Sequence, residues 1–324
     1  MLPDLFSRRR LLALTAAAIP ALALPARQTR GAETAYAGSA PGSGQGSGAP
    51  RVGIALGAGG ANGLAHILML EALDELAIKP HRIAGSSMGA VIGALYASGM
   101  TARQIRELID KLIISPKESL FEELTDEASL RWIEFLDIDL GHGGFLSGEN
   151  FVNFLYETIH TDTFAELEIP LKIVAADLWH HTQVVLESGS LLSAIKASMA
   201  LPGVFEPVEL DGRTLVDGGT VNPVPYDLLM EECDIVIGIE VIGDRTIPRS
   251  GKASYLDTIF NSVKVMQRAI MAEKLRRVKP HIYIAPEIYD IRALEFYRAN
   301  EVYEQARPAR KQLEVQLTQL LSRT

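Results

Sequence analysis

A serine between two glycines is the strongest candidate for chemistry in this chain. The sequence Gly85-Ser86-Ser87-Met88-Gly89 follows an apolar run typical of a strand and precedes a run of small and apolar residues typical of a helix. A sharp strand-to-helix turn needs small neighbours and exposes a serine hydroxyl at the start of the helix. We therefore expect Ser87 to be a nucleophile. The alternative is that Ser86 and Ser87 only cap the helix.

A nucleophilic serine needs a base to accept its proton, and Asp217 is the candidate. This residue is followed by Gly218 and Gly219, which place its carboxylate at a tight turn. An ordinary aspartate has a pKa near 3.9 and is a weak base, so we expect Asp217 to be partly desolvated and close to Ser87. An Asp-Gly pair is also common in simple turns, which is the other interpretation.

The seven histidines leave a Ser-Asp-His triad open as an alternative. In the chain order of α/β-hydrolases, only His281 follows Asp217. His281 opens an expected strand, whereas catalytic groups meet at the carboxyl ends of strands. His66 shares a helix face with Asn62 and is expected to hold neighbouring backbone. The pair His180-His181 has no further ligand at suitable spacing, so neither a metal nor a cofactor is expected.

A glycine cluster, Gly57-Ala-Gly-Gly-Ala-Asn-Gly63, follows the first expected strand. A dinucleotide-binding loop is one interpretation, but its third glycine would come one residue late, and the acidic residue expected about 20 positions further on is missing. The other interpretation is an oxyanion hole. In that case the backbone N–H groups of Gly59, Gly60 and Ala61 would stabilise a developing negative charge near a helix start.

The elements that must position these residues alternate between strands and helices. Strands are expected over 51–56, 81–85, 171–176, 183–187, 235–241 and 281–285. Helices are expected over 61–78, 90–98, 101–114, 149–160, 191–198, 223–232, 256–277 and from 291 onward. This alternation predicts an α/β fold with a mainly parallel sheet that is covered on both faces.

The segment 114–148 fits neither a helical nor a strand period. It combines a proline, a patch of acidic residues, aromatic side chains and a glycine-rich end. Long irregular insertions in compact domains are often lids or binding loops, and a surface helix with a loop is the alternative.

The first 50 residues differ from the rest. Ser7-Arg-Arg-Arg-Leu-Leu12 leads into an apolar run over 11–24 and resembles a twin-arginine signal. The run is shorter than the roughly 20 residues that span a bilayer. We expect a signal peptide over 1–26, periplasmic or secreted localisation in a bacterium, a flexible Gly/Ser/Ala/Pro linker over 27–50, and one folded domain over 51–324. An ordinary basic N-terminus is the alternative.

Composition excludes several classes of function. Hydrophobic residues make up 48% of the chain, enough for a substantial core. Forty acidic and 31 basic residues leave a net charge of −9, so no nucleic acid partner is expected. The single Cys233 cannot form an internal disulfide. The negative charge gives no general attraction to anionic membranes, so transient contact with a membrane surface would need a local apolar patch, such as one in 114–148.

Four segments together resemble the bacterial patatin-like phospholipase family; they cover 56–66, 85–89, 197–205 and 215–223. The resemblance extends over about 52–296 and implies a three-layer α/β/α fold and a Ser-Asp dyad without histidine. It implies that Ser87 is the nucleophile and Asp217 its base, and that the substrate is a lipid ester, either a phospholipid or a lysophospholipid. It also implies supporting roles for Gly57, Asn62, Gly63, Gly85, Gly89, Gly218 and Gly219.

The sequence departs from the family pattern at Asn62. The glycine loop usually has Arg or Lys before its last glycine, whereas asparagine carries no charge. Backbone oxyanion donors would survive this change, but any help from the cation in orienting the loop or meeting a phosphate would not. Ala58 is a milder departure, at a position that is glycine in many relatives. A non-catalytic scaffold that binds lipid or protein therefore stays open as an alternative.

Overall fold

The computed structural model describes residues 49–114, 155, 157–159, 161–244, 246 and 255–323. The predicted signal peptide, nearly all of the predicted linker and all but the first residue of the irregular segment 114–148 lie outside these residues. Of the helix predicted over 149–160, four residues are described, at positions 155 and 157–159, and they are helical.

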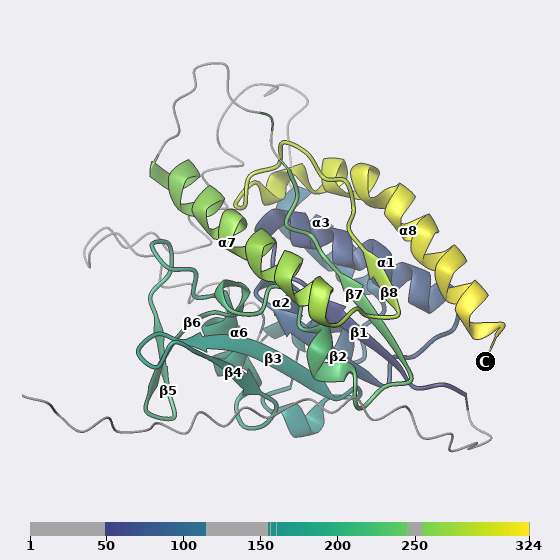
Figure 1. Cartoon of the computed structure of the whole chain (residues 1–324), viewed down its shortest axis with the longest axis horizontal. Helices are drawn as coiled ribbons and strands as arrows, with labels where there is room; N and C mark the ends of the chain where they lie inside the picture. The colour runs from purple at the N-terminus through teal and green to yellow at the C-terminus, as the bar shows by residue number, and fades with distance from the viewer. Residues whose placement is uncertain are drawn as a thin grey trace, which may run out of the picture. The chain divides into compact units, whose positions relative to one another are not determined.

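One sheet of eight strands forms the centre of the described structure (Figure 1). The strands are β1 (Val52–Leu56), β2 (Arg82–Ser86), β3 (Leu171–Asp177), β4 (Thr182–Leu186), β5 (Val208–Leu210), β6 (Arg213–Asp217), β7 (Ile235–Ile239) and β8 (Ile282–Ile284). Their order is β5-β6-β3-β2-β1-β7-β8, and β4 also pairs with β3. The six strands predicted from apolar runs are all present, with ends that differ by two residues or fewer.

The centre of the sheet is parallel, as predicted. β1 pairs in parallel with β2 and β7, β2 with β3, and β7 with β8. The pairs β3 with β4, β3 with β6, and β5 with β6 are antiparallel. The hairpin of β5 and β6 was not predicted, because β5 has only three residues and neither strand carries a run of buried apolar side chains.

Along the chain, the helices and helical turns alternate with the strands, and η5 and α8 follow the last strand. The α-helices are α1 (Ala65–Glu75), α2 (Met88–Ala97), α3 (Ala102–Ile114), α6 (Leu191–Met199), α7 (Tyr255–Arg277) and α8 (Ala299–Leu321). The 3-10 turns are η1 (Gly60–Leu64), η2 (Phe164–Glu166), η3 (Gly218–Thr220), η4 (Tyr226–Leu229) and η5 (Phe296–Arg298). No helix in the described ranges is both long enough and apolar enough to cross a membrane.

Two of the helix predictions need correction. The helix predicted over 223–232 is wrong, since only the short turn η4 forms there; Pro223 and Pro225 cannot donate backbone hydrogen bonds. The C-terminal helix begins at Ala299 and not at Ile291, because the chain before it runs past the glycine loop, where the carbonyl of Ala293 accepts a hydrogen bond from the N–H of Ala61.

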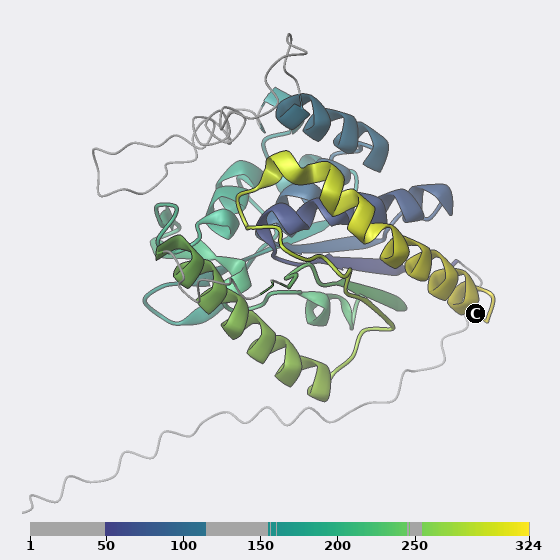
Figure 2. The same ribbon diagram turned by 90° about the horizontal axis from the view of Figure 1, so that it is seen from above.

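Successive side chains of the central strands point to opposite faces of the sheet. On β1, Ile54 and Leu56 belong to the core cluster shared with α1, α2, α3 and α8. Ala55, between them, belongs to a second cluster with Tyr226 and with Met271 of α7. Figure 2 shows α7 and α8 on opposite faces of the sheet. The three-layer α/β/α architecture is therefore confirmed.

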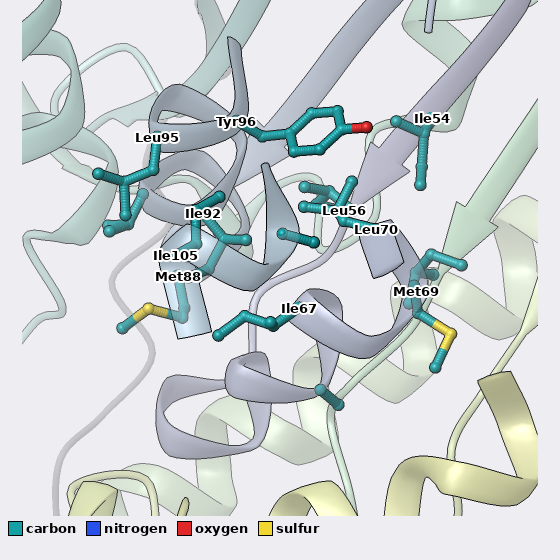
Figure 3. Packing of buried hydrophobic residues seen from close by; sticks show 14 of the residues in the cluster. Ile54, Leu56, Ile67, Met69, Leu70, Met88, Ile92, Leu95, Tyr96 and Ile105 are labelled. Carbon is teal, nitrogen blue, oxygen red and sulfur yellow. The ribbon is translucent and has the colours of Figure 1, made fainter. Parts of the chain in front are cut away.

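The larger core cluster fixes α2 against the sheet. All ten residues of α2 are buried, and Ile92 and Leu95 pack among side chains of α1 and β1 such as Ile67 and Leu56 (Figure 3). Small residues on α2 allow this close approach: at Gly93, an added Cβ atom would lie 3.2 Å from Ile83 of β2. The start of α2, which carries the candidate nucleophile, is thus held by a rigid core.

Candidate active site

The predicted turn from strand to helix is present at Ser87. β2 ends at Ser86 and α2 begins at Met88, and Ser87 between them has φ +53° and ψ −124°. A positive φ is strained for a residue other than glycine, and such strain often occurs at functional sites. The strand, turn and helix predicted around Ser87 are therefore confirmed.

The hydroxyl of Ser87 contacts the carboxylate of Asp217. Ser87 Oγ donates a hydrogen bond to Asp217 Oδ2 at 2.6 Å. Ser87 makes no capping hydrogen bond to α2, and the hydroxyl of Ser86 donates instead to the backbone oxygen of Asn222 at 2.7 Å. The structure therefore joins the two candidate residues, and it excludes helix capping as the role of this serine pair.

Asp217 is a buried carboxylate at the end of β6. Its side chain is 3% exposed, and its second oxygen, Oδ1, accepts a hydrogen bond from the N–H of Gly219 at 2.7 Å. Burial raises the pKa of Asp217 to about 6, although the hydrogen bonds from Ser87 and Gly219 act in the opposite direction. The expectation of a desolvated carboxylate near Ser87 is confirmed, and Asp217 is a stronger base than an ordinary aspartate.

The end of α6 holds both candidate residues in place. The hydroxyl of Ser198 accepts a hydrogen bond from the Ser87 N–H at 2.9 Å and donates to the carbonyl of Val174 at 2.6 Å. Two residues later, the carbonyl of Ala200 accepts from the Asp217 N–H at 2.9 Å. Sequence reasoning missed this role of Ser198. A polar residue at the centre of a segment of small and apolar residues was the available signal.

The glycine loop lies beside this pair. Gly59 and Gly60 line the same cavity as Ser87 and Asp217, with a volume of about 50 Å³. Their N–H groups make no backbone hydrogen bond to another described residue, so they are available to a bound group. The assignment of Ala61 as an oxyanion donor is wrong, because its N–H donates to the carbonyl of Ala293 at 2.8 Å.

The motif glycines are required by close packing. A Cβ atom would come within 3.0 Å of another atom at each of Gly57, Gly59, Gly60, Gly63, Gly85, Gly89, Gly218 and Gly219. At Gly89 the nearest atom would be the carbonyl oxygen of Leu56 at 2.0 Å, and at Gly218 that of Val174 at 2.1 Å. Backbone cannot move aside as a flexible side chain can. The glycines therefore let α2 and the turn after Asp217 approach the carboxyl ends of the strands.

Asn62 and His66 are buried side chains that tie the glycine loop and the first turn after it to neighbouring backbone. Asn62 is 1% exposed, and its Nδ2 donates to the carbonyl of Ile242 at 3.2 Å, in the segment after β7. Asn62 is not among the residues that line the cavity. His66 Nε2 donates to the carbonyl of Gly57 at 2.8 Å, and burial lowers the pKa of His66 to about 4. The expected structural role of His66 is confirmed.

The remaining histidines do not complete a triad. His281 Nδ1 accepts a hydrogen bond from the N–H of Val236 at 3.0 Å, near the start of β7. This is the opposite end of the parallel strands from Ser87, so the alternative with His281 as base is wrong. His180 bonds to Asp177 at 2.9 Å, a partner that the sequence did not suggest. Within the described residues, no group of three His, Cys, Asp or Glu side chains is arranged to hold a metal ion.

One wall of the cavity comes from α7, to which the sequence assigned no functional role. Its contribution is one helix face, made of Phe260, Val263, Lys264 and Gln267. Other parts of the chain add the apolar side chains of Ala58, Leu201, Ile242 and Ala293 to the lining. The only available signal was the helical spacing of these four residues, and a helix face by itself does not show what it covers.

Comparison with known proteins identifies the family. Residues 54–230 match the family model described as patatin-like phospholipase. An uncharacterised NTE family protein of Mycobacterium tuberculosis is 36% identical over 205 residues, which cover 63% of this chain and 52% of that protein. Neuropathy target esterase of Drosophila melanogaster is 31% identical over 180 residues, 55% of this chain and 12% of that protein. The chain thus spans about half the length of the mycobacterial relative.

Among solved structures, that of VipD from Legionella pneumophila is similar with a TM-score of 0.45 and 15% identity, over 82% of this chain and 67% of that chain. The family model, in contrast, matches more than half of this sequence. Its span includes the glycine loop, the turn at Ser87 and the turn at Asp217, which the fold brings together around one cavity. This chain belongs to the patatin-like phospholipase family.

Proposed function

We propose that this protein is a serine acyl hydrolase that cleaves lipid esters of the phospholipid or lysophospholipid class. The observation that carries the proposal is the 2.6 Å hydrogen bond from Ser87 Oγ to the buried carboxylate of Asp217. A nucleophile and a base within hydrogen-bond reach are what covalent acyl transfer requires. Membership of the patatin-like phospholipase family supports a lipid ester as the substrate.

In the proposed mechanism, Asp217 accepts the Ser87 proton while Ser87 Oγ attacks the ester carbonyl carbon. The carbonyl oxygen becomes negatively charged, and the N–H groups of Gly59 and Gly60 stabilise it. The tetrahedral intermediate then expels the alcohol, which takes the proton from Asp217. The acyl group is left on Ser87, and a water molecule later releases it as a carboxylic acid.

The cavity suits the reacting end of such a substrate. Its lining includes the apolar side chains Leu201, Ile242, Phe260 and Val263. Its volume of about 50 Å³ is far below the roughly 300–1,000 Å³ of pockets that enclose a whole drug-sized ligand. The cavity therefore has room only for the groups around the ester bond, and the rest of a lipid would extend beyond it.

A fluorophosphonate probe tests the proposal. We expect covalent labelling of the wild-type protein at Ser87, identified by mass spectrometry of the labelled peptide, and no labelling of Ser87→Ala. The wild type should also release fatty acids from a mixed lipid extract, and the released acids would identify the acyl preference. A folded wild-type protein that takes up no probe and releases no fatty acid would instead support a non-catalytic scaffold.

The pKa of Asp217 sets an expected pH dependence. The carboxylate must be ionised to accept a proton, and burial raises its pKa to about 6. Below that value we expect kcat/KM to rise about tenfold per pH unit, and above it to level off. Hydrolysis of a soluble ester from about pH 4 to 8, with circular dichroism to confirm the fold, measures this. An acid limb near pH 4 would contradict the role assigned to burial.

A further inference from the structure

Gln267 of α7 is a buried polar residue that has no role in the acylation step of the proposed mechanism. Its side chain is 6% exposed and lines the cavity that contains Ser87 and Asp217. The structure shows no hydrogen bond between the Gln267 amide and any residue that it describes. Neither amide atom is among the fully buried, unpaired side-chain atoms of the described residues, so the amide reaches the accessible space of the cavity. A group that enters the cavity would therefore supply the missing partner.

The Gln267 amide reaches the same place as the Asp217 carboxylate. A Cβ atom added to Gly219 would lie 2.7 Å from Gln267 Nε2 and 3.0 Å from Asp217 Oδ1. The amide therefore lies beside Gly219, near the carboxylate of Asp217 whose other oxygen, Oδ2, accepts the hydrogen bond of Ser87. Gly59 and Gly60, the proposed oxyanion donors, belong to a different loop. Ala58 of that loop also lies 2.5 Å from the added Cβ atom, so Gln267, Asp217 and the glycine loop meet at one place in the cavity.

The helix that carries Gln267 is anchored to the turn after Asp217. Two turns further along α7, Lys274 Nζ donates to Asn222 Oδ1 at 2.6 Å and to the carbonyl of Val224 at 2.7 Å. Between them, Met271 is 2% exposed in the core. The amide is thus presented by a rigid element, which is what positioning a small reactant requires.

We propose that the Gln267 amide binds the water molecule that hydrolyses the acyl-enzyme. The inference rests on the proposed function, in which Ser87 becomes acylated. Once Ser87 Oγ carries the acyl group it has no proton, so Asp217 Oδ2 loses its hydrogen-bond donor. A water molecule then donates one hydrogen bond to Asp217 and the other to the amide oxygen of Gln267. The cavity volume of about 50 Å³ can hold one water molecule in this position.

The hydrolytic step then balances. The oxygen of the water bonds to the acyl carbon as Asp217 takes one of its protons. The intermediate collapses with cleavage of the bond between Ser87 Oγ and the acyl carbon. Asp217 returns the proton to Ser87 Oγ, and the carboxylic acid leaves. Gln267 exchanges no proton; it orients the lone pair of the water toward the acyl carbon.

Gln267→Met separates this role from a role in acylation, because methionine has a similar length but no amide. With p-nitrophenyl butyrate we expect a burst of about one equivalent of nitrophenol, followed by steady turnover about 100-fold slower than in the wild type. Labelling of Ser87 by a fluorophosphonate should proceed at the wild-type rate, since it needs no water. Gln312→Met, the same substitution at an exposed position of α8, should match the wild type in both assays.

Two results would overturn the inference. One is steady turnover of Gln267→Met at the wild-type rate. The other is a loss of labelling as large as the loss of turnover, which would place Gln267 in acylation or in maintaining the fold; thermal unfolding of the variant distinguishes these two cases. If the wild type itself is neither labelled nor hydrolyses the ester, the proposed function fails, and the inference fails with it.

Discussion

Asp217→Asn is expected to lower kcat by a factor of about 10³ or more, by analogy with the loss of single catalytic groups in serine hydrolases. Asparagine has the shape of aspartate: its amide oxygen can accept the hydrogen bond from the Gly219 N–H while its Nδ2 donates to Ser87 Oγ. It cannot take up the Ser87 proton at neutral pH. The substitution therefore removes the base and leaves the geometry of the site in place.

The same variant is expected to be more stable than the wild type at pH 8. Burial raises the pKa of Asp217 from 3.8 to about 6, so the folded state holds a proton that the unfolded state has released between these values. The stability of the wild type must then fall as the pH rises from about 4 to about 6, and stay lower above that range. The free energy of unfolding of the wild type therefore decreases by about 3 kcal/mol at most over this range. The asparagine side chain of the variant carries no charge and escapes this cost.

Turnover of a soluble ester and urea denaturation at about pH 4 and pH 8 measure both effects. Asp211→Asn is a matched control, because Asp211 is an exposed carboxylate in the turn between β5 and β6. We expect this control to retain wild-type activity and stability. Full activity of Asp217→Asn would reject the dyad, whereas low activity together with lower stability at pH 8 would show that the carboxylate is needed for the fold.

Lys274→Met is expected to destabilise the protein by about 3 kcal/mol, the lower end of the range for breaking a buried ion pair. The Lys274 side chain is 12% exposed, and its ammonium group donates to Asn222, to Val224 and to the carboxylate of Asp227. The ring of Tyr226 lies 4.4 Å from the same nitrogen. Methionine would leave Asn222 Oδ1 and the carbonyl of Val224 without this donor, and Asp227 would keep only the hydrogen bond from Asn222 Nδ2 at 3.1 Å; the partial exposure of Asp227 lessens the loss.

The double variant Lys274→Met/Asp227→Asn should recover part of the lost stability, because it no longer leaves a carboxylate unpaired. We expect kcat to be reduced in both the single and the double variant, since Asn222, whose backbone oxygen accepts the hydrogen bond of Ser86 beside the nucleophile, lacks its lysine partner in both. Lys311→Met, at an exposed position of α8, is the control for the substitution itself. Urea denaturation gives the stabilities. A single variant as stable as the wild type would show that the cluster contributes little.

The amino-acid sequence by itself determined the centre of the sheet and the two residues that we propose react with the substrate. Short apolar strands, small residues and glycines have local causes, so their pattern can be recognised without a fold. Ser87 and Asp217 were identifiable because glycines flank them, and these glycines are needed wherever backbone approaches backbone, as at Gly89 and Gly218. The short hairpin of β5 and β6 was missed, because pairing with β3 stabilises it and its own pattern does not.

Only the tertiary structure decided which groups have partners. From the sequence, the N–H of Ala61 was expected to be free to bind an oxyanion. In the structure, the chain before α8 returns to the glycine loop, and the carbonyl of Ala293 accepts the hydrogen bond of the Ala61 N–H. Ser198 and Lys274 hold the site from α6 and α7, and Gln267 enters the cavity although it lies outside the family match. Hydrogen bonding and desolvation depend on atoms that are distant in the chain and adjacent in space. Composition and spacing do not show such contacts directly. The cavity wall formed by α7 could therefore be identified only from the packing of that helix in the structure.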